Sequence, residues 1–171
     1  CGMTTSYGSI VTVHGEVLHN ERHDGVIAGG DLVLADVGAE TPEGWAGDVT
    51  RTWPGSGRMS GTQRELYQLV LAAQLAAIEA VRPGACYRDV HRTAGRGLVS
   101  RLVELGILKG DAEDLFARGA AGLFFPHGVG HLLGLDVHDM EDLGDRAGYA
   151  PGRTRSRKFG LAYLRLDRDL Q

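Results

Sequence analysis

The feature that most constrains the fold is an apolar run of six residues, Leu32–Val37, that holds one carboxylate, Asp36. Its letters are L-V-L-A-D-V, and glycines bound it, with Gly29-Gly30 before and Gly38 after. An aliphatic run of this length between glycines is typical of a buried strand. We therefore expect a strand here with Asp36 as its only charged residue.

Further strands are predicted on both sides of this run. Residues Trp45–Trp53 alternate well enough to form the next strand, and the connection to them contains a proline and a glycine. Such a short connection favours an antiparallel pair. Before the run, Ile10–Val13 and Glu16–Leu18 are short aliphatic stretches around His14-Gly15, which predict a hairpin.

Helical patterns follow the strands. Thr62 and Glu65 have the spacing of a capping box, and apolar residues recur after them at helical spacing until Pro83-Gly84. A second helix is predicted over Tyr87–Leu105, closed by Gly106.

The remainder of the chain predicts one short helix and a return to strands. The helix covers Ala112–Ala117, and Leu123–Phe125 and Leu132–Val137 are strand-like in composition. The order of strands, helices and strands indicates an α+β class, with helices on one face of a mainly antiparallel sheet.

Composition excludes some classes of partner. The chain has 171 residues and a net charge of −4, which disfavours nucleic acid, and no apolar run is long enough to cross a bilayer. The basic run Arg153–Lys158 is interpreted as a solvated loop. Cys1 and Cys86 are too few and too far apart for a disulfide framework, so a cytoplasmic setting is expected. Because the chain begins with cysteine, we expect it to be a piece of a longer product.

Two aspartates interrupt strand-like segments. Taken alone, Asp36 has an ordinary interpretation as a solvent-facing residue at a strand end. Asp48 lies one hairpin connection away, and adjacent antiparallel strands can bring both carboxylates to one face. Two such charges repel unless a proton or a cation lies between them, and hard divalent metals prefer oxygen ligands. The residues themselves leave both interpretations open.

Three of the seven histidines fall between positions 127 and 138. His127 and His131 are four apart in H-G-V-G-H, but glycine stands where the helical zinc motif H-E-x-x-H has its glutamate. The glycines and Pro126 disfavour a helix, so an extended or looped backbone is expected. By spacing alone, ordinary loop histidines remain the simpler interpretation.

Taken together, three segments resemble a known family. They are V-L-H-N, then D-V-G with G-D-V-T-R-T-W-P, and finally H-G-V-G-H-L-L-G-L-D-V-H-D. In this order and separation they are similar to the pita-bread (creatinase/aminopeptidase-like) metallopeptidases, and among these to Xaa-Pro aminopeptidases and prolidases. The likeness covers nearly the whole chain. It implies a two-metal enzyme that releases the N-terminal residue before proline, in a protein whose full length is compatible with a homo-oligomer.

The resemblance also implies a role for each motif residue. Asp36 would bind one metal, Asp48 would bridge both, and His131 would bind the second. His127 and His138 would contact the substrate and support the reaction intermediate, and His19 would line the substrate pocket. The metals are expected to be manganese, with cobalt or zinc as substitutes, and the substrate a peptide with proline in second position.

The chain departs from the family pattern after these motifs. Two glutamate ligands of the family lie on strands beyond the last motif, and residues 1–171 do not contain them. We therefore expect a partial catalytic domain that lacks the N-terminal domain and the final strands, and that is inactive by itself. A dipeptidase (prolidase) remains an alternative. So do a non-catalytic peptide-binding module and a metal-free creatine hydrolase of the same fold, although both would be expected to lack the aspartate pair.

Overall fold

A computed structural model describes residues 2–171, so Cys1 lies outside the described part. The chain divides into two compact units. The first contains the residues up to Arg64 together with Leu133–Asp139, and the second contains Glu65–Leu132 and Met140–Gln171. Each unit is described by itself.

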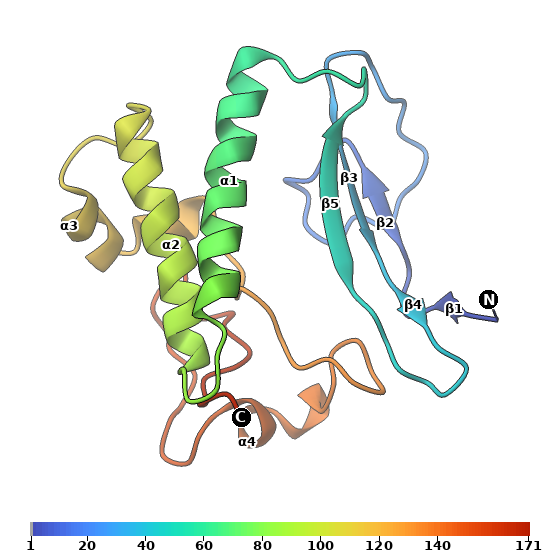
Figure 1. Cartoon of the computed structure of the whole chain (residues 1–171), viewed down its shortest axis with the longest axis vertical. Coiled ribbons are helices and arrows are strands. Elements are labelled where there is room, and N and C mark those ends of the chain that lie inside the picture. The colour runs from blue at the N-terminus through green and yellow to red at the C-terminus, as the bar shows by residue number, and fades with distance from the viewer. Residues whose placement is uncertain (1) are drawn as a thin grey trace. The chain divides into compact units, whose positions relative to one another are not determined.

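The first unit is built on a three-stranded antiparallel sheet (Figure 1). Its strands are β2 (Ile10–Thr12), β3 (Leu32–Val37) and β5 (Val49–Pro54), in the order β2-β3-β5. The central strand is the apolar run with the bounds predicted from sequence. The next strand is antiparallel to it, as predicted, but begins at Val49 instead of Trp45.

A small ribbon completes this unit. Strand β1 (Thr4–Thr5) pairs with β4 (Ala39–Glu40), so the residues after β1 meet the residues that follow β3. The predicted strand at Glu16–Leu18 is wrong, because this stretch turns back on itself and the N–H of Val17 donates to the carbonyl of His14 at 2.9 Å.

The second unit contains the helices. They are α1 (Gly61–Ala80), which starts in the first unit, α2 (Tyr87–Glu104) and α3 (Ala112–Ala117). Three short helical pieces follow, η1 (Ala120–Leu123), η2 (Glu141–Leu143) and α4 (Asp145–Gly148). Among residues 2–171, no helix is long and apolar enough to cross a membrane.

The ends of the helices follow local chemistry. The capping box of α1 is formed by Ser60 and Gln63, two residues earlier than predicted: the Gln63 N–H donates to Ser60 Oγ at 3.2 Å and the Ser60 N–H to Gln63 Oε1 at 2.9 Å. The prediction of Thr62 and Glu65 is therefore wrong. At the C-terminal end of α2, Gly106 has φ 72° and its N–H donates to the Val103 carbonyl, which closes the helix as predicted.

Two predicted strands of the C-terminal half are absent from the described residues. Leu123–Phe125 continues η1, since the N–H of Phe125 donates to the carbonyl of Ala121 at 2.8 Å. Leu132–Val137 forms a local turn in which the Gly134 N–H donates to the Asp136 carbonyl at 3.2 Å. In both places a glycine makes a close contact: a Cβ at Gly122 would lie 2.8 Å from Gly160 Cα, and one at Gly134 would lie 2.7 Å from the Asp139 carboxylate.

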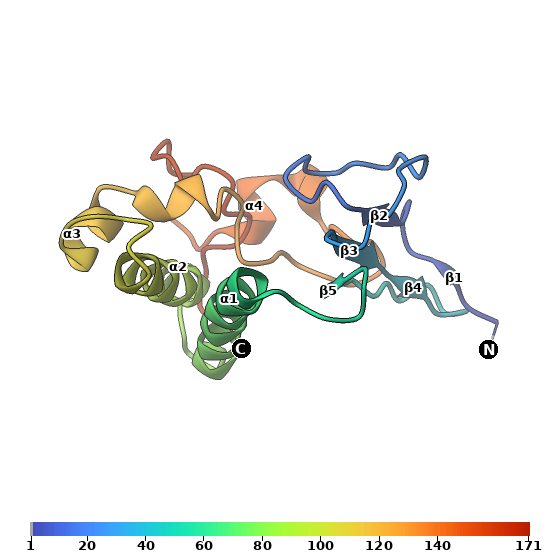
Figure 2. The ribbon, with the colours of Figure 1, turned by 90° about the horizontal axis from the view of Figure 1, so that it is seen from above.

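The core of the second unit lies between α1 and α2, which run side by side (Figures 1 and 2). Two clusters of buried side chains join the helices, and the second lies nearer the connection between them. Phe125 packs against both clusters. The buried members are Leu69, Ala73, Leu98 and Leu102 in the first cluster and Ala77, Val90 and Ala94 in the second. Gly95 of α2 lets α3 and η1 approach, because a Cβ there would lie 3.2 Å from the Phe116 ring and 3.4 Å from Ala121 Cβ.

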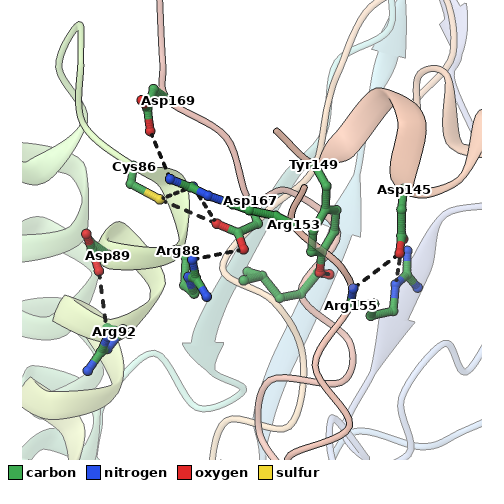
Figure 3. A network of polar contacts seen from close by, with 11 residues as sticks. Cys86, Arg88, Asp89, Arg92, Asp145, Tyr149, Arg153, Arg155, Asp167 and Asp169 are labelled. Atoms are coloured by element: carbon green, nitrogen blue, oxygen red, sulfur yellow. Dashed lines mark hydrogen bonds and ion pairs between the residues drawn. The ribbon is translucent and has the colours of Figure 1, made fainter. Parts of the chain in front are cut away.

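Figure 3 shows the polar network that attaches the C-terminal segment to the start of α2. Asp167, only 2% exposed, accepts from Arg153 at 3.0 Å and forms an ion pair with Arg88 at 3.3 Å. The Cys86 thiol donates to the same carboxylate at 3.4 Å. The basic run is thus not merely a solvated loop, because its Arg153 is bound to a buried carboxylate.

Asp167→Asn is expected to lower the free energy of unfolding by about 1–3 kcal/mol, because both arginines lose a charged partner that is excluded from water. The measurement is the urea midpoint. Asp169→Asn is the matched control: Asp169 contacts Arg153 only at 3.7 Å and its side chain is 64% exposed, so its cost should stay within about 0.5 kcal/mol. Equal costs for the two variants would contradict the role given to Asp167.

His91, on α2, is a buried histidine of this core. It is 5% exposed, its Nε2 donates to the Gly160 carbonyl at 3.1 Å, and its ring stacks on Phe125 with 4.8 Å between centroids. Burial lowers the pKa of His91 below its ordinary value of 6.5, because the charged imidazolium loses its hydration.

The depressed pKa of His91 predicts a loss of stability in mild acid. The unfolded chain binds the proton more readily than the folded chain. The free energy of unfolding therefore keeps its full value above pH 6.5 and decreases as the pH is lowered from 6.5, by at most about 1.4 kcal/mol per pH unit. Urea unfolding between pH 7.5 and 5 measures this slope. His91→Gln retains a hydrogen-bond donor but does not titrate, and its slope should be shallower. Parallel slopes would refute the prediction.

Candidate functional site

The two predicted ligand aspartates lie on neighbouring strands of the first unit. Asp36 is the fifth residue of β3 and is in register with Thr50 of β5, while Asp48 stands immediately before β5. Side chains alternate along a strand, so positions 48 and 50 project to the same face as Asp36. Both aspartates are half-buried.

A tyrosine hydroxyl joins the two carboxylates. Tyr7 Oη donates to Asp36 Oδ1 at 2.6 Å and lies 2.9 Å from Asp48 Oδ1. A hydroxyl has one proton, so it donates fully to one carboxylate at a time. Burial and the two neighbouring carboxylates raise the pKa of Tyr7 well above its ordinary value, which keeps the phenol protonated. Two acidic groups thus converge on one point.

A close backbone contact holds this arrangement. The Ser6 N–H donates to the Gly38 carbonyl at 3.2 Å and Ser6 Oγ donates to the Gly47 carbonyl at 2.7 Å. Gly38 follows β3, and a Cβ there would lie closer than 3.0 Å to the Gly47 carbonyl oxygen, a distance that real Cβ atoms essentially never show. The glycines of D-V-G and G-D therefore bring the two aspartate-bearing segments and the Ser6–Tyr7 segment together.

The segment that holds His138 belongs to the same unit. The N–H of Ala46 donates to the Gly134 carbonyl at 2.9 Å, which joins this segment to the connection between the aspartates. Asp139 folds back within hydrogen-bonding reach of the Asp136 N–H at 3.4 Å, and a Cβ at Gly134 would lie 2.7 Å from its carboxylate. His138 is therefore carried by a looped backbone, whereas Leu132–Val137 before it was predicted to be a strand.

His19 is also in the first unit, in an exposed turn. Its φ of 58° lies in the left-handed region, which a non-glycine residue adopts rarely and at a cost of about 1 kcal/mol or more. The substrate-pocket role expected for His19 stays a prediction.

The two histidines of H-G-V-G-H lie in the second unit. The His127 ring is tilted against the Tyr163 ring with 5.6 Å between centroids. His131 Nδ1 lies 2.8 Å from its neighbour's carbonyl oxygen, that of Leu132, and must donate to it. In the neutral ring this places the lone pair on Nε2, which is how metal-binding histidines are commonly oriented.

The structure thus brings together part of the predicted site. Asp36 and Asp48 are neighbours, His19 and His138 share their unit, and His127 and His131 belong to the other unit. Within residues 2–171, no group of three or more His, Cys, Asp or Glu side chains is gathered closely enough to hold a metal. The donor pair that does converge, two half-buried carboxylates, suits a hard divalent cation.

Sequence reasoning missed Tyr7. Nothing in S-Y-G-S-I marks a tyrosine that reaches two aspartates 29 and 41 residues away. The β1–β4 pairing that brings it there consists of only two residue pairs. Gly38, by contrast, was visible as the glycine of D-V-G, although its steric role was not.

Comparison with known proteins identifies the family. The sequence profile of metallopeptidase family M24 matches residues 2–159. Because this is most of the chain, the protein belongs to metallopeptidase family M24.

Curated relatives narrow the likeness. The chain is 46% identical over 140 residues to Xaa-Pro aminopeptidase 2 of Streptomyces coelicolor, which covers 81% of this chain and 30% of that protein. It is 44% identical over 137 residues to the Xaa-Pro aminopeptidase of Escherichia coli, which covers 79% of this chain and 31% of that protein. The chain thus spans about a third of the length of these relatives.

Solved structures agree with this. Aminopeptidase PepP of Pseudomonas aeruginosa has a TM-score of 0.80 and 37% identity, over 98% of this chain and 34% of that chain. Zinc-substituted E. coli aminopeptidase P in complex with product has a TM-score of 0.78 and 37% identity, over 95% of this chain and 40% of that chain. These similarities confirm the predicted resemblance and the predicted α+β pita-bread fold.

Gly38→Ala is expected to destabilise the protein by about 1–3 kcal/mol or more, because the new methyl group would overlap both the Gly47 carbonyl and the Ser6 side chain. Gly29→Ala is the matched control, since nothing lies within 4 Å of a Cβ there, and it should change stability by less than about 0.5 kcal/mol. Thermal unfolding of both variants gives the comparison. Tolerance of alanine at position 38 would contradict the packing described.

Proposed function

We propose that this chain carries part of the active site of a two-metal aminopeptidase that releases the N-terminal residue from peptides with proline in second position. The observation that carries the proposal is the convergence of Asp36 and Asp48 on one tyrosine hydroxyl. The names of the curated relatives support the substrate class.

Asp36 and Asp48 are the residues that would hold the cations. Two carboxylates this close repel one another, and a proton or a cation relieves the repulsion. In the structure the Tyr7 hydroxyl supplies a shared proton donor. We assign Asp36 to one metal, Asp48 as a bridge to both, and His131 Nε2 to the second metal, because its Nδ1 is oriented by a carbonyl.

A pair of bound divalent cations would supply an acidified water and polarise the scissile carbonyl. The chain's own histidines would do the remaining work. An imidazole titrates near neutral pH, so His127 and His138 are suited to hold the developing charge and to pass a proton to the leaving proline nitrogen. His19 would border the substrate, in the strained turn that presents it.

Manganese is the proposed metal, with cobalt or zinc as substitutes; the name of a solved relative records zinc substitution in the E. coli enzyme. A cytoplasmic setting is proposed from the low cysteine content and from Cys86, whose thiol forms no disulfide and donates a hydrogen bond to Asp167. We further propose that the full protein adds two glutamate ligands to those named above, and that residues 1–171 are a partial catalytic domain.

The 171-residue chain is expected to show no turnover of an Xaa-Pro peptide in the presence of Mn²⁺, because three ligands cannot complete a two-metal site. Release of the N-terminal residue is measured, with a complete aminopeptidase P as the positive control. Turnover comparable to that enzyme would overturn the proposal that the site is partial.

The same assay on the longer gene product tests the proposed activity itself. That product should cleave Xaa-Pro peptides with Mn²⁺, and Asp48→Asn should reduce kcat at least 100-fold, the order expected when a group that stabilises the transition state is removed. Asp31→Asn is the control, because the Asp31 side chain accepts from the Ala28 N–H at 2.8 Å and an asparagine oxygen can accept in the same way. A longer product that is active without metal would overturn the metallopeptidase assignment.

A further inference from the structure

The three residues between His127 and His131 are enclosed by different parts of the second unit. Val129 packs against the core cluster of Ala77, Val90 and Ala94. Its two glycine neighbours meet other parts of the second unit. The backbone that separates the two histidines is therefore held by packing, although it forms neither helix nor strand.

Gly130 lies directly against Tyr87, the first residue of α2. A Cβ at Gly130 would fall closer than 3.0 Å to Tyr87 Oη, which real Cβ atoms essentially never show. The next nearest atom, Tyr87 Cζ, would lie at 3.6 Å, an ordinary contact. The hydroxyl oxygen is thus the one atom that a side chain at position 130 would overlap.

Gly128 meets a different neighbour. A Cβ there would lie 3.0 Å from the Tyr163 carbonyl oxygen and 3.1 Å from Leu164 Cα, both backbone atoms of the C-terminal segment. Tyr87 takes no part in this contact. The two glycines of H-G-V-G-H therefore meet two different neighbours.

Tyr87 cannot easily move away from Gly130. Its ring packs against the Ala77, Val90 and Ala94 cluster, and its N–H donates to the Arg168 carbonyl at 3.0 Å. Burial raises the pKa of Tyr87 above its ordinary value, so the group that meets Gly130 is a neutral hydroxyl. One turn further along α2, His91 stacks on Phe125, two residues before His127.

We propose that Tyr87 is a positioning residue, whose hydroxyl sets the path of the backbone at Gly130 and thereby the orientation of the His131 imidazole. It touches neither substrate nor metal in this proposal, and acts through one glycine. The value of that orientation for catalysis rests on the function proposed above, whereas the contact itself does not.

A double-mutant cycle tests the contact on the 171-residue chain. Gly130→Ala should lower the urea midpoint, because the methyl group and the Tyr87 hydroxyl compete for one space. Tyr87→Phe removes that oxygen and leaves Cζ at an ordinary distance. Tyr87→Phe combined with Gly130→Ala should therefore recover at least half of the midpoint lost in Gly130→Ala.

Gly128→Ala is the matched control in the same segment. It should also lower the midpoint, but Tyr87→Phe should recover none of that loss, because the obstacle at position 128 is backbone of residues 163–164. If Gly130→Ala alone does not fold, recovery of folding in the double variant supports the proposal. Failure of the double variant to fold while Tyr87→Phe folds overturns it.

The orientation of His131 needs a readout that a merely structural role would not move. Long-range ¹H–¹⁵N spectra of labelled histidine report which ring nitrogen carries the proton. His131 should be the Nδ1–H form, held by the Leu132 carbonyl. In Gly130→Ala its two ring nitrogen shifts should move towards one another, and in the double variant they should return. Unchanged His131 shifts in Gly130→Ala would overturn the positioning role.

These results are separable from the proposed function. The cycle and the spectra need neither metal nor peptide, so an inactive longer gene product would refute the aminopeptidase proposal and leave the Tyr87 contact intact. Conversely, an active longer product combined with a failed cycle would refute only the positioning role.

Discussion

The structure of the first unit depends on holding two carboxylates side by side. Antiparallel pairing of β3 and β5 brings Asp36 and Asp48 to one face, and their charges oppose that approach. Tyr7 offers a shared hydroxyl, and the contact of Gly38 with Gly47 brings the strand ends close enough to use it. The β1–β4 ribbon and the Ser6 hydrogen bonds bring Tyr7 to the two carboxylates.

In the second unit, packing restricts the backbone of the histidine segment. This segment has no ladder of backbone hydrogen bonds to fix it, so neighbouring atoms must do so. The Tyr87 hydroxyl, the backbone of residues 163–164 and the core around Val129 each restrict one of three consecutive residues. Both units thus use glycine where two parts of the chain must approach more closely than a side chain permits.

The elements predicted best were those specified by local signals. The apolar run of β3, the bounds of α3, and the end of α2 at Gly106 follow from periodicity, capping and left-handed glycine. The errors arose where a second local feature of the sequence acted in place of the one used for the prediction. Ser60 and Gln63 capped α1 in place of Thr62 and Glu65. The apolar stretches at 123–125 and 132–137 lie beside Gly122 and contain Gly134, where close contacts leave no room for a side chain.

The sequence by itself determined the family and the identity of the candidate residues, because the chemistry of a metal site demands particular side chains at separations that the chain displays directly. Only the tertiary structure decided which of these candidate residues meet, and which other side chains hold them in place. Tyr7 and Tyr87 act across 29 to 43 residues of chain. Contacts of that range depend on packing and steric exclusion, and neither leaves a pattern in the neighbouring sequence.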